Sequence, residues 1–180
     1  EIDNNEIKEI RRNDMYKVYS VDASKKWIKT TRTEIKRQRR LDCYINMNYS
    51  KVAMSEHNGI ICTKYQQLPN CLPDIIYLDA PDQYSPIGTI NGVSTAHPDR
   101  MPMSGDILTI EYFLQPGCLI IVDGRGANAI FLKNNLQRNW AYIYLEEYDQ
   151  HFFELQEIPI GKFNKAYLQY SLGEQYFERI

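Results

Sequence analysis

The run Cys118-Leu-Ile-Ile-Val-Asp123 is apolar until its final aspartate. Strands that are buried on both faces of a parallel sheet have this composition. A second run, Asp74-Ile-Ile-Tyr-Leu-Asp79, has the same form and also ends in an aspartate. We therefore expect two buried strands, each followed by a carboxylate.

A third strand is predicted upstream, over residues 16–22, where β-forming residues alternate up to Asp22. Ser24 is a suitable N-cap for a following helix. The apolar face of that helix would consist of Trp27, Ile28, Thr31 and Ile35. Its other positions are rich in Lys and Arg, and the acidic remainder of the chain favours a solvated face over a phosphate-binding one.

The middle of the chain predicts a hairpin and then a long loop. Residues 43–54 and 59–65 have the composition of strands, and Asn58-Gly59 between them is the strongest short hairpin signal. The connection over 80–103 is longer than usual, as functional loops often are. Ser104 is the expected cap of the next helix.

The last third of the chain predicts a helix over residues 127–137 and a second hairpin. Strands over 140–145 and 151–156 are expected to pair antiparallel. The tail over 162–180 contains several tyrosines and is expected to form a short helix or an interaction arm.

Strands that alternate with helices predict an α/β fold. We expect a Rossmann-like, mostly parallel sheet flanked by helices and ending in an antiparallel hairpin. One domain would cover residues 1–161, with 162–180 as a C-terminal tail. Ligands of such sheets bind beyond the carboxyl ends of the strands. Asp22, Asp79 and Asp123 should therefore meet in one crevice.

Composition excludes several classes of protein. The 180 residues carry 21 basic and 23 acidic side chains, a net charge of −2, which argues against a general nucleic-acid binder. No apolar run approaches the about 20 residues of a membrane span. No signal segment opens the chain, so we expect a cytoplasmic protein. The four cysteines and three histidines do not cluster, which argues against a zinc site or a disulfide framework.

The three aspartates each allow a functional and a structural interpretation. Asp22 could accept hydrogen bonds from ribose hydroxyls, or it could be a carboxylate near a helix N-terminus that the helix dipole favours. Asp79 and Asp123 could hold a divalent cation, or one of them could take the proton of a substrate hydroxyl. They could equally form tight turns, with Arg125 as an ion-pair partner of Asp123.

Two histidines are of a residue type that can serve as a catalytic group. His97 lies in the long loop and could act as a general base, although a single loop histidine is more often simply exposed. His151 follows Asp149 and Gln150, and we expect this segment to be a turn. No Gly-x-Ser-x-Gly sequence is present, so a serine nucleophile has no support.

Three stretches together resemble class I S-adenosylmethionine-dependent methyltransferases: residues 19–28, 73–83 and 116–125, in that order. More specifically, residues 73–161 resemble bacterial methyltransferase-like proteins that are often associated with surface-polysaccharide genes. The resemblance implies that Asp22 and nearby Ser24 bind the cofactor and that Asp79 faces the methyl-transfer centre.

In metal-dependent O-methyltransferases of this class, carboxylates at the last two strand ends hold magnesium beside the acceptor oxygen. The resemblance therefore implies Asp79 and Asp123 as metal ligands. The family's first strand and glycine-rich loop have no counterpart before Asp22, since the first glycine is Gly59. The domain is accordingly expected to be incomplete at its N-terminus.

These observations favour an O-methyltransferase acting on a sugar or another small hydroxylated acceptor, with S-adenosylmethionine and Mg²⁺ as cofactors. A non-catalytic module that binds or assembles through its tyrosine-rich tail is the main alternative. A nicotinamide-dependent oxidoreductase is a third. Among partners we expect a small-molecule acceptor, no nucleic acid and no membrane span, and a homo-oligomer stays open.

Overall fold

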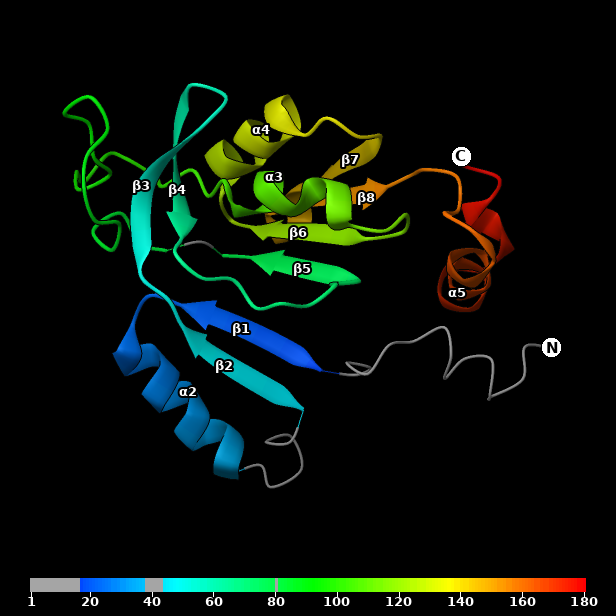
Figure 1. The fold of residues 1–180 in the computed structure, drawn as a ribbon, viewed down its shortest axis with the longest axis horizontal. Coiled ribbons are helices and arrows are strands. Elements are labelled where there is room, and N and C mark those ends of the chain that lie inside the picture. Colours follow the sequence, from blue (N-terminus) through cyan, green and yellow to red (C-terminus); the bar gives the residue numbers. More distant parts are fainter. Residues whose placement is uncertain (1–16, 38–43, 80) are drawn as a thin grey trace. The chain divides into compact units, whose positions relative to one another are not determined.

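The computed structural model describes residues 17–37, 44–79 and 81–180, and the chain divides into two compact units (Figure 1). The N-terminal unit lies within residues 16–71 and 80–109. The C-terminal unit contains residues 72–79 and 110–180. Each unit is built around its own strands.

A parallel pair of strands with a connecting helix opens the N-terminal unit. β1 (Val18–Asp22) pairs in parallel with β2 (Ile45–Tyr49), and α2 (Lys25–Arg37) lies between them in the chain. Ile28 is buried and anchors the helix. The predicted strand and helix are therefore present.

The antiparallel hairpin predicted around Asn58-Gly59 is confirmed. β3 (Val52–His57) and β4 (Ile60–Tyr65) pair with His57 opposite Ile60. Both turn residues have positive φ, 50° at Asn58 and 79° at Gly59, which the favoured two-residue turns require. The first arm is shorter than the predicted 43–54, because residues 45–49 pair with β1 instead, and Cys43 lies outside the described residues.

The long loop forms backbone hydrogen bonds with both strands of this hairpin. The Ile87 amide donates to the Val52 carbonyl at 2.9 Å, and on the other side the Thr63 amide donates to the Met103 carbonyl at 2.8 Å. The loop is thus held by backbone hydrogen bonds to β3 and β4. α3 (Asp106–Ile110) begins after it, later than the Ser104 cap predicted, because Ser104 forms a bridge with Thr63.

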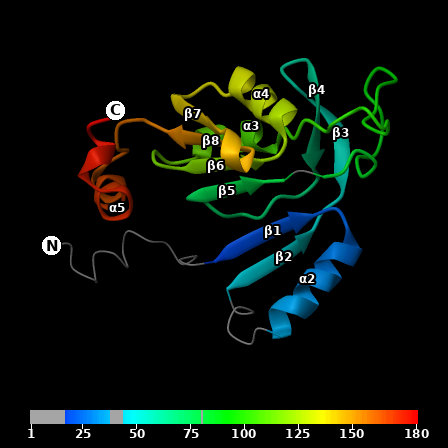
Figure 2. The same cartoon turned by 180° about the vertical axis from the view of Figure 1, so that it is seen from behind.

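A four-stranded mixed sheet forms the C-terminal unit (Figure 2). Its order is β5-β6-β8-β7. β5 and β6 are parallel, whereas β8 runs antiparallel to both β6 and β7, which confirms the predicted pairing of the last two strands. The strands are β5 (Ile75–Leu78), β6 (Leu119–Asp123), β7 (Trp140–Leu145) and β8 (Gln150–Leu155).

Short helices cover this sheet. α4 (Gly126–Asn135) directly follows the loop after β6 and buries Ala129 and Leu132, and a 3₁₀ turn, η1 (Glu111–Phe113), precedes β6. A further 3₁₀ turn, η2 (Glu146–Tyr148), joins β7 to β8. The fully buried part of the core is made by β6, β8 and α4.

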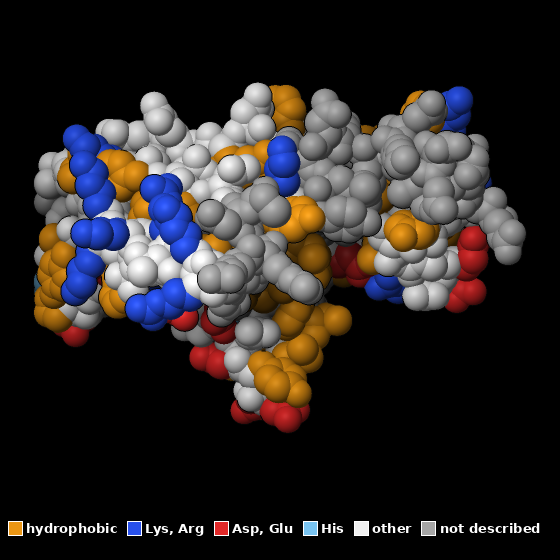
Figure 3. All heavy atoms as spheres, turned by 90° about the horizontal axis from the view of Figure 1, so that it is seen from below, with side chains coloured by type: hydrophobic (Ala, Val, Ile, Leu, Met, Phe, Trp, Pro, Cys, Tyr) orange, Lys and Arg blue, Asp and Glu red, His pale blue; other side chains and the backbone are white. Residues whose placement is uncertain are grey.

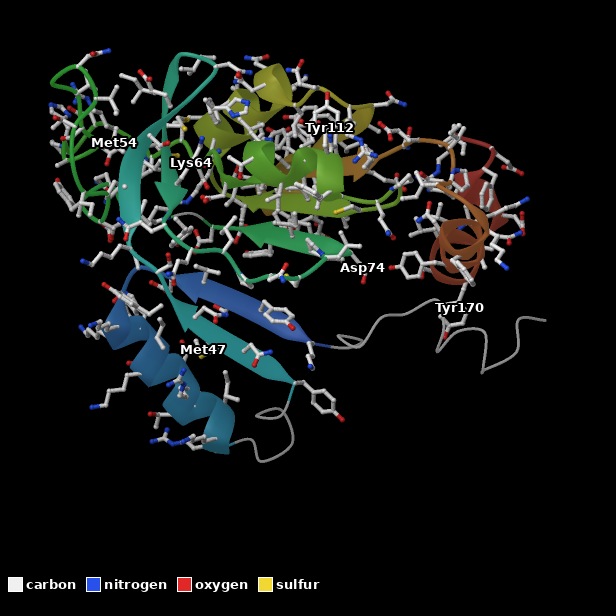
Figure 4. All side chains as sticks on the ribbon, viewed as in Figure 1. Met47, Met54, Lys64, Asp74, Tyr112 and Tyr170 are labelled. Carbon is white, nitrogen blue, oxygen red and sulfur yellow. The ribbon has the colours of Figure 1, made fainter. Side chains whose placement is uncertain are left out.

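The C-terminal residues complete the core of this unit. α5 (Lys162–Leu172) is followed by the 3₁₀ turn η3 (Glu174–Tyr176). Leu168 and Tyr176 are fully buried, and the Tyr176 hydroxyl donates to the Leu155 carbonyl at 3.1 Å. Tyr170, labelled in Figure 4, is exposed on α5.

The predicted Rossmann-like parallel sheet is wrong. The described strands form three separate sheets, one parallel, one antiparallel and one mixed, in a small mixed α/β protein. The sequence runs that end in aspartate do form strands. β1, however, finds its parallel partner in the locally available β2, and not in the sheet that contains β5 and β6. No helix among the described residues has the length and apolar character needed to cross a bilayer.

Candidate functional site at the strand ends of the C-terminal unit

Two aspartates leave the C-terminal sheet side by side. Leu78 of β5 pairs with Val122 of β6, so the next residues, Asp79 and Asp123, follow adjacent parallel strands at the same edge. Three neighbouring side chains contact these carboxylates: Tyr77, Arg125 and Gln150. We call these five residues the strand-end cluster.

Asp123 is held by two uncharged donors. The Tyr77 hydroxyl donates a short hydrogen bond to Asp123 Oδ2, and Gln150 Nε2 donates to Oδ1 at 3.2 Å. These hydrogen bonds, that of Tyr77 foremost, lower the pKa of Asp123 below its ordinary value. The same hydrogen bond raises the pKa of Tyr77 to about 12, with smaller contributions from burial and from the charges of Asp123 and Asp79. Both carboxylates therefore help to raise the pKa of the Tyr77 phenol.

Replacing Tyr77 with Phe should raise the pKa of Asp123 toward its ordinary value, because the main donor to the carboxylate is lost. Asp123 contributes stability above its unfolded pKa and loses it as the pH falls through the folded value. Tyr77 contributes stability below its ordinary pKa and loses it as the pH rises through about 12. Carboxyl-carbon NMR titration measures the shift.

Tyr144→Phe is the matched control, because it removes a phenol that donates to Asp149 at 3.0 Å instead. The Asp123 titration should be the same in Tyr144→Phe as in the unmodified protein. An unchanged Asp123 pKa in Tyr77→Phe would show that the hydrogen bond does not set it.

Asp79 is paired with a cation and yet open to solvent. Arg125 Nε lies 3.3 Å from Asp79 Oδ1, and the side chains are 18% and 76% exposed respectively. Arg125 stands next to the loop glycine Gly124, whose φ of 59° turns the chain from β6 toward α4. The ion pair leaves Asp79 Oδ2 facing solvent as a hydrogen-bond acceptor.

The pair Asp79 and Asp123 does not fit a magnesium ion as implied by the resemblance. A guanidinium group already neutralises Asp79 and would repel a cation placed between the carboxylates. Each oxygen of Asp123 already accepts a hydrogen bond from a protein donor. Within the described residues, no group of three or more His, Cys, Asp or Glu side chains could hold a metal ion. We derive no step through a metal.

His151 lies beside the loop that carries Arg125, and sequence reasoning assigned it to a turn. It is 6% exposed, stacks on Tyr144 at 4.4 Å between ring centroids, and shares a 2.9 Å hydrogen bond between Nδ1 and the Tyr142 hydroxyl. Nε2 is buried without a hydrogen-bond partner and lies 3.6 Å from the position of a Cβ added at Gly126.

Burial lowers the pKa of His151, so its ring is neutral at neutral pH, and the charge of Asp149 opposes that shift. The alternating residues of β8 contained the signal for its inward position, since every second side chain from His151 onward is buried. His151 supports the loop between β6 and α4.

The cofactor residues expected upstream lie in the N-terminal unit. Asp22 Oδ1 accepts a hydrogen bond from the Ser24 amide at 2.6 Å, and Ser24 Oγ accepts one from the Trp27 amide at 3.3 Å. Asp22 thus forms a local turn with Ser24, and Ser24 is the residue that caps α2, as predicted. Because β1 belongs to another sheet, the predicted meeting of three aspartates at the edge of one sheet does not occur.

His97 also lies in the N-terminal unit, in the long loop. Its Nδ1 accepts a hydrogen bond from the Asp99 amide at 3.2 Å and lies 3.8 Å from the Asp99 carboxylate. The side chain is about half exposed. These contacts form a local turn, and they connect His97 with no residue of the strand-end cluster.

Comparison with known proteins found no matching family model, no matching curated protein and no matching solved structure. The chemistry of the site therefore has to be inferred from its side chains. Carboxylates, a phenol and a guanidinium at one exposed edge form the kind of donor and acceptor set that binds hydroxyl groups.

Proposed function

We propose that the strand-end cluster binds a small hydroxylated acceptor and that the protein is an S-adenosylmethionine-dependent O-methyltransferase, with a sugar as the preferred acceptor class. The observation that carries this proposal is the exposed Asp79 carboxylate beside Asp123 at the ends of two adjacent parallel strands. The proposal draws on these residues and on the sequence resemblance, and not on a Rossmann-like sheet.

Each residue of the cluster has a role in this proposal. Asp79 Oδ2 accepts a hydrogen bond from the acceptor hydroxyl and takes its proton as the oxygen is methylated. Arg125 holds Asp79 in place through Oδ1. Asp123, with its pKa held low, stays ionised and fixes the Tyr77 ring. In this proposal, side chains that do not react hold the site in its geometry.

The cofactor would supply an electrophilic methyl group, with the S–C bonding electrons remaining on sulfur. Among the residues expected to bind it, Asp22 fits through one oxygen, because Oδ1 is used by the Ser24 amide. Ser24 is occupied as a helix cap. Asp22 Oδ2 is therefore the proposed contact with a ribose hydroxyl, and Ser24 has a positioning role through Asp22.

A non-catalytic binding module is the second candidate. It is favoured by the fact that both strand-end carboxylates already have protein donors, so that the site is stable without a reaction. Its expected interaction arm is only partly exposed, because Tyr176 of the tail is buried in the core. In this alternative the cluster binds a hydroxylated ligand and leaves it unchanged.

Calorimetric titration of the full chain with S-adenosylhomocysteine separates the two candidates. The methyltransferase is expected to bind it, and Asp22→Ala should weaken binding about tenfold, the effect of losing one hydrogen bond to a charged group. Asp99→Ala removes an exposed carboxylate of the same unit and should leave the affinity unchanged.

Absence of binding, or equal affinity of the unmodified protein and Asp22→Ala, would contradict the methyltransferase. The acceptor site is tested separately by NMR with a panel of methyl glycosides. Signals around Asp79 and Arg125 should shift on addition of the glycosides, and Asp79→Ala should abolish these shifts. Shifts that persist in Asp79→Ala would place the ligand elsewhere.

A further inference from the structure

Four cationic side chains form a row on one face of α2. Lys25, Lys29, Arg32 and Lys36 are separated by four, three and four residues, the spacing at which helical side chains share a face. With a rise of 1.5 Å per residue the row extends for about 16 Å along the helix. Figure 3 shows Lys and Arg side chains gathered over this helix.

The row borders a hollow of about 310 Å³ on the surface of the N-terminal unit. This volume lies at the lower end of the range for small-molecule sites, about 300–1,000 Å³. None of the described residues that line the hollow is acidic. They are Lys25, Ile28, Lys29, Arg32, Thr33, Lys36 and Tyr49.

Several contacts hold the lining in place. Ile28 is buried beneath the helix, and the Thr33 hydroxyl donates to the Lys29 carbonyl at 2.9 Å. Arg32 donates to the Met47 carbonyl at 3.3 Å, and the Met47 side chain lies between α2 and β2 (Figure 4). Lys25 Nζ lies 4.8 Å from the centre of the Tyr49 ring on β2. The hollow is therefore formed by side chains of α2 and β2 that are held in place by these contacts.

The positive charge of the hollow has no acidic lining residue to balance it. Glu34, the acidic residue of α2, forms an ion pair with Arg37 at 3.0 Å. Asp22, just before the helix, is not among the residues that line the hollow. Like charges four residues apart on a helix repel one another, as at Lys25 and Lys29. A bound anion would relieve this repulsion.

We propose that this hollow binds a small molecule that carries at least two phosphate groups. One phosphate would balance only part of the charge of four cationic side chains, whereas two linked phosphates bring more negative charge to the same helix face. A nucleic-acid strand is disfavoured because the chain as a whole carries a net charge of −2. Cationic side chains one helical turn apart, such as Lys25, Lys29 and Arg32, suit the closely spaced charges of a diphosphate.

The lining also indicates how such a ligand would be bound. The planar guanidinium of Arg32 can donate two parallel hydrogen bonds to one phosphate, whereas the lysines act as point charges. The partly exposed ring of Tyr49 offers an apolar surface to the rest of the ligand. The hollow shares no lining residue with the strand-end cluster. The test of diphosphate binding can therefore succeed or fail separately from the test of the proposed methyl transfer.

Calorimetric titration of the full chain with inorganic pyrophosphate, adenosine diphosphate and inorganic phosphate tests this proposal. Pyrophosphate is expected to bind at one saturable site, at least tenfold more tightly than phosphate. Lys29→Gln and Arg32→Gln should each weaken pyrophosphate binding about five- to tenfold, since each removes a charge-assisted hydrogen bond. Lys29→Gln tests the site even if loss of the Arg32 contact with Met47 disturbs folding.

Lys26→Gln is the matched control, because it removes the same charge from the same helix at a position that does not line the hollow. It should change the affinity less than twofold, and Lys29→Gln should leave the titration with S-adenosylhomocysteine unchanged. If adenosine diphosphate binds more tightly than pyrophosphate, the ligand class is a nucleoside diphosphate. If the two affinities are equal, the hollow recognises the diphosphate group alone. Both results support the site. The proposal is overturned by a lack of saturable pyrophosphate binding, by equal losses in Lys26→Gln and Lys29→Gln, or by tighter binding of a single-stranded oligonucleotide.

Discussion

Glu111→Ala is expected to lower the free energy of unfolding of the C-terminal unit by about 3–5 kcal/mol. Glu111 is 2% exposed, and its Oε1 atom accepts hydrogen bonds from the amides of Gln137 and Arg138 at 2.9 and 2.8 Å. The Trp140 indole donates to the same oxygen at 2.9 Å. Alanine would leave three part-buried donors without this acceptor, and each such loss carries its own desolvation cost.

Glu111→Gln is the control for this prediction, because glutamine keeps an oxygen at the position of Oε1. It is expected to cost about 1–2 kcal/mol, the difference between a charged and an uncharged acceptor. Urea unfolding followed by circular dichroism measures both variants. A cost below about 1 kcal/mol for Glu111→Ala would mean that water replaces the carboxylate, and the segment after α4 would then be less tightly packed than described.

Gly117→Ala is the second substitution with a large expected effect. Gly117 has a φ of 84°, a region that side chains other than glycine rarely adopt, and an added Cβ would lie 2.4 Å from Leu168 Cδ2 and 3.0 Å from Leu172 Cδ1. Backbone strain and the clash with α5 should together cost about 2–4 kcal/mol. The midpoint of thermal or urea unfolding should fall accordingly.

Gly88→Ala separates the two causes, because Gly88 has nearly the same φ as Gly117, 85°, with no heavy atom within 4 Å of an added Cβ. It should cost only about 1–2 kcal/mol, the strain alone. If the free energy of unfolding falls by the same amount in both alanine variants, α5 does not pack against the turn before β6. The expected difference would confirm that residues 162–180 belong to the core of the C-terminal unit.

Local patterns were sufficient for the individual elements. The apolar runs ending at Asp79 and Asp123 predicted β5 and β6, and Asn58-Gly59 predicted the hairpin of β3 and β4. These signals act over a few residues: side-chain burial, β-propensity and the positive φ of a tight turn. Such preferences are properties of the segment itself.

Several contacts of the candidate site could not be predicted from the sequence, because they join residues that are far apart in the chain. The pairing of Asp79 with Arg125 joins residues 46 positions apart, and the hydrogen bond from Tyr77 to Asp123 spans the same separation. The Glu111 carboxylate likewise accepts hydrogen bonds from three donors that lie 26 to 29 positions away in the chain. Only the packed sheet shows which donor meets which acceptor.

The sequence by itself determined where most strands and helices form, and it singled out the carboxylates that end β5 and β6. Tertiary structure decided that the strands form three sheets, that β1, which ends at Asp22, belongs to a different sheet from β5 and β6, and that His151 is buried. The physical reason is that backbone hydrogen bonds between strands are the same for every residue type. The choice of partner strand therefore depends on how whole elements bury their apolar faces, and not on any one segment.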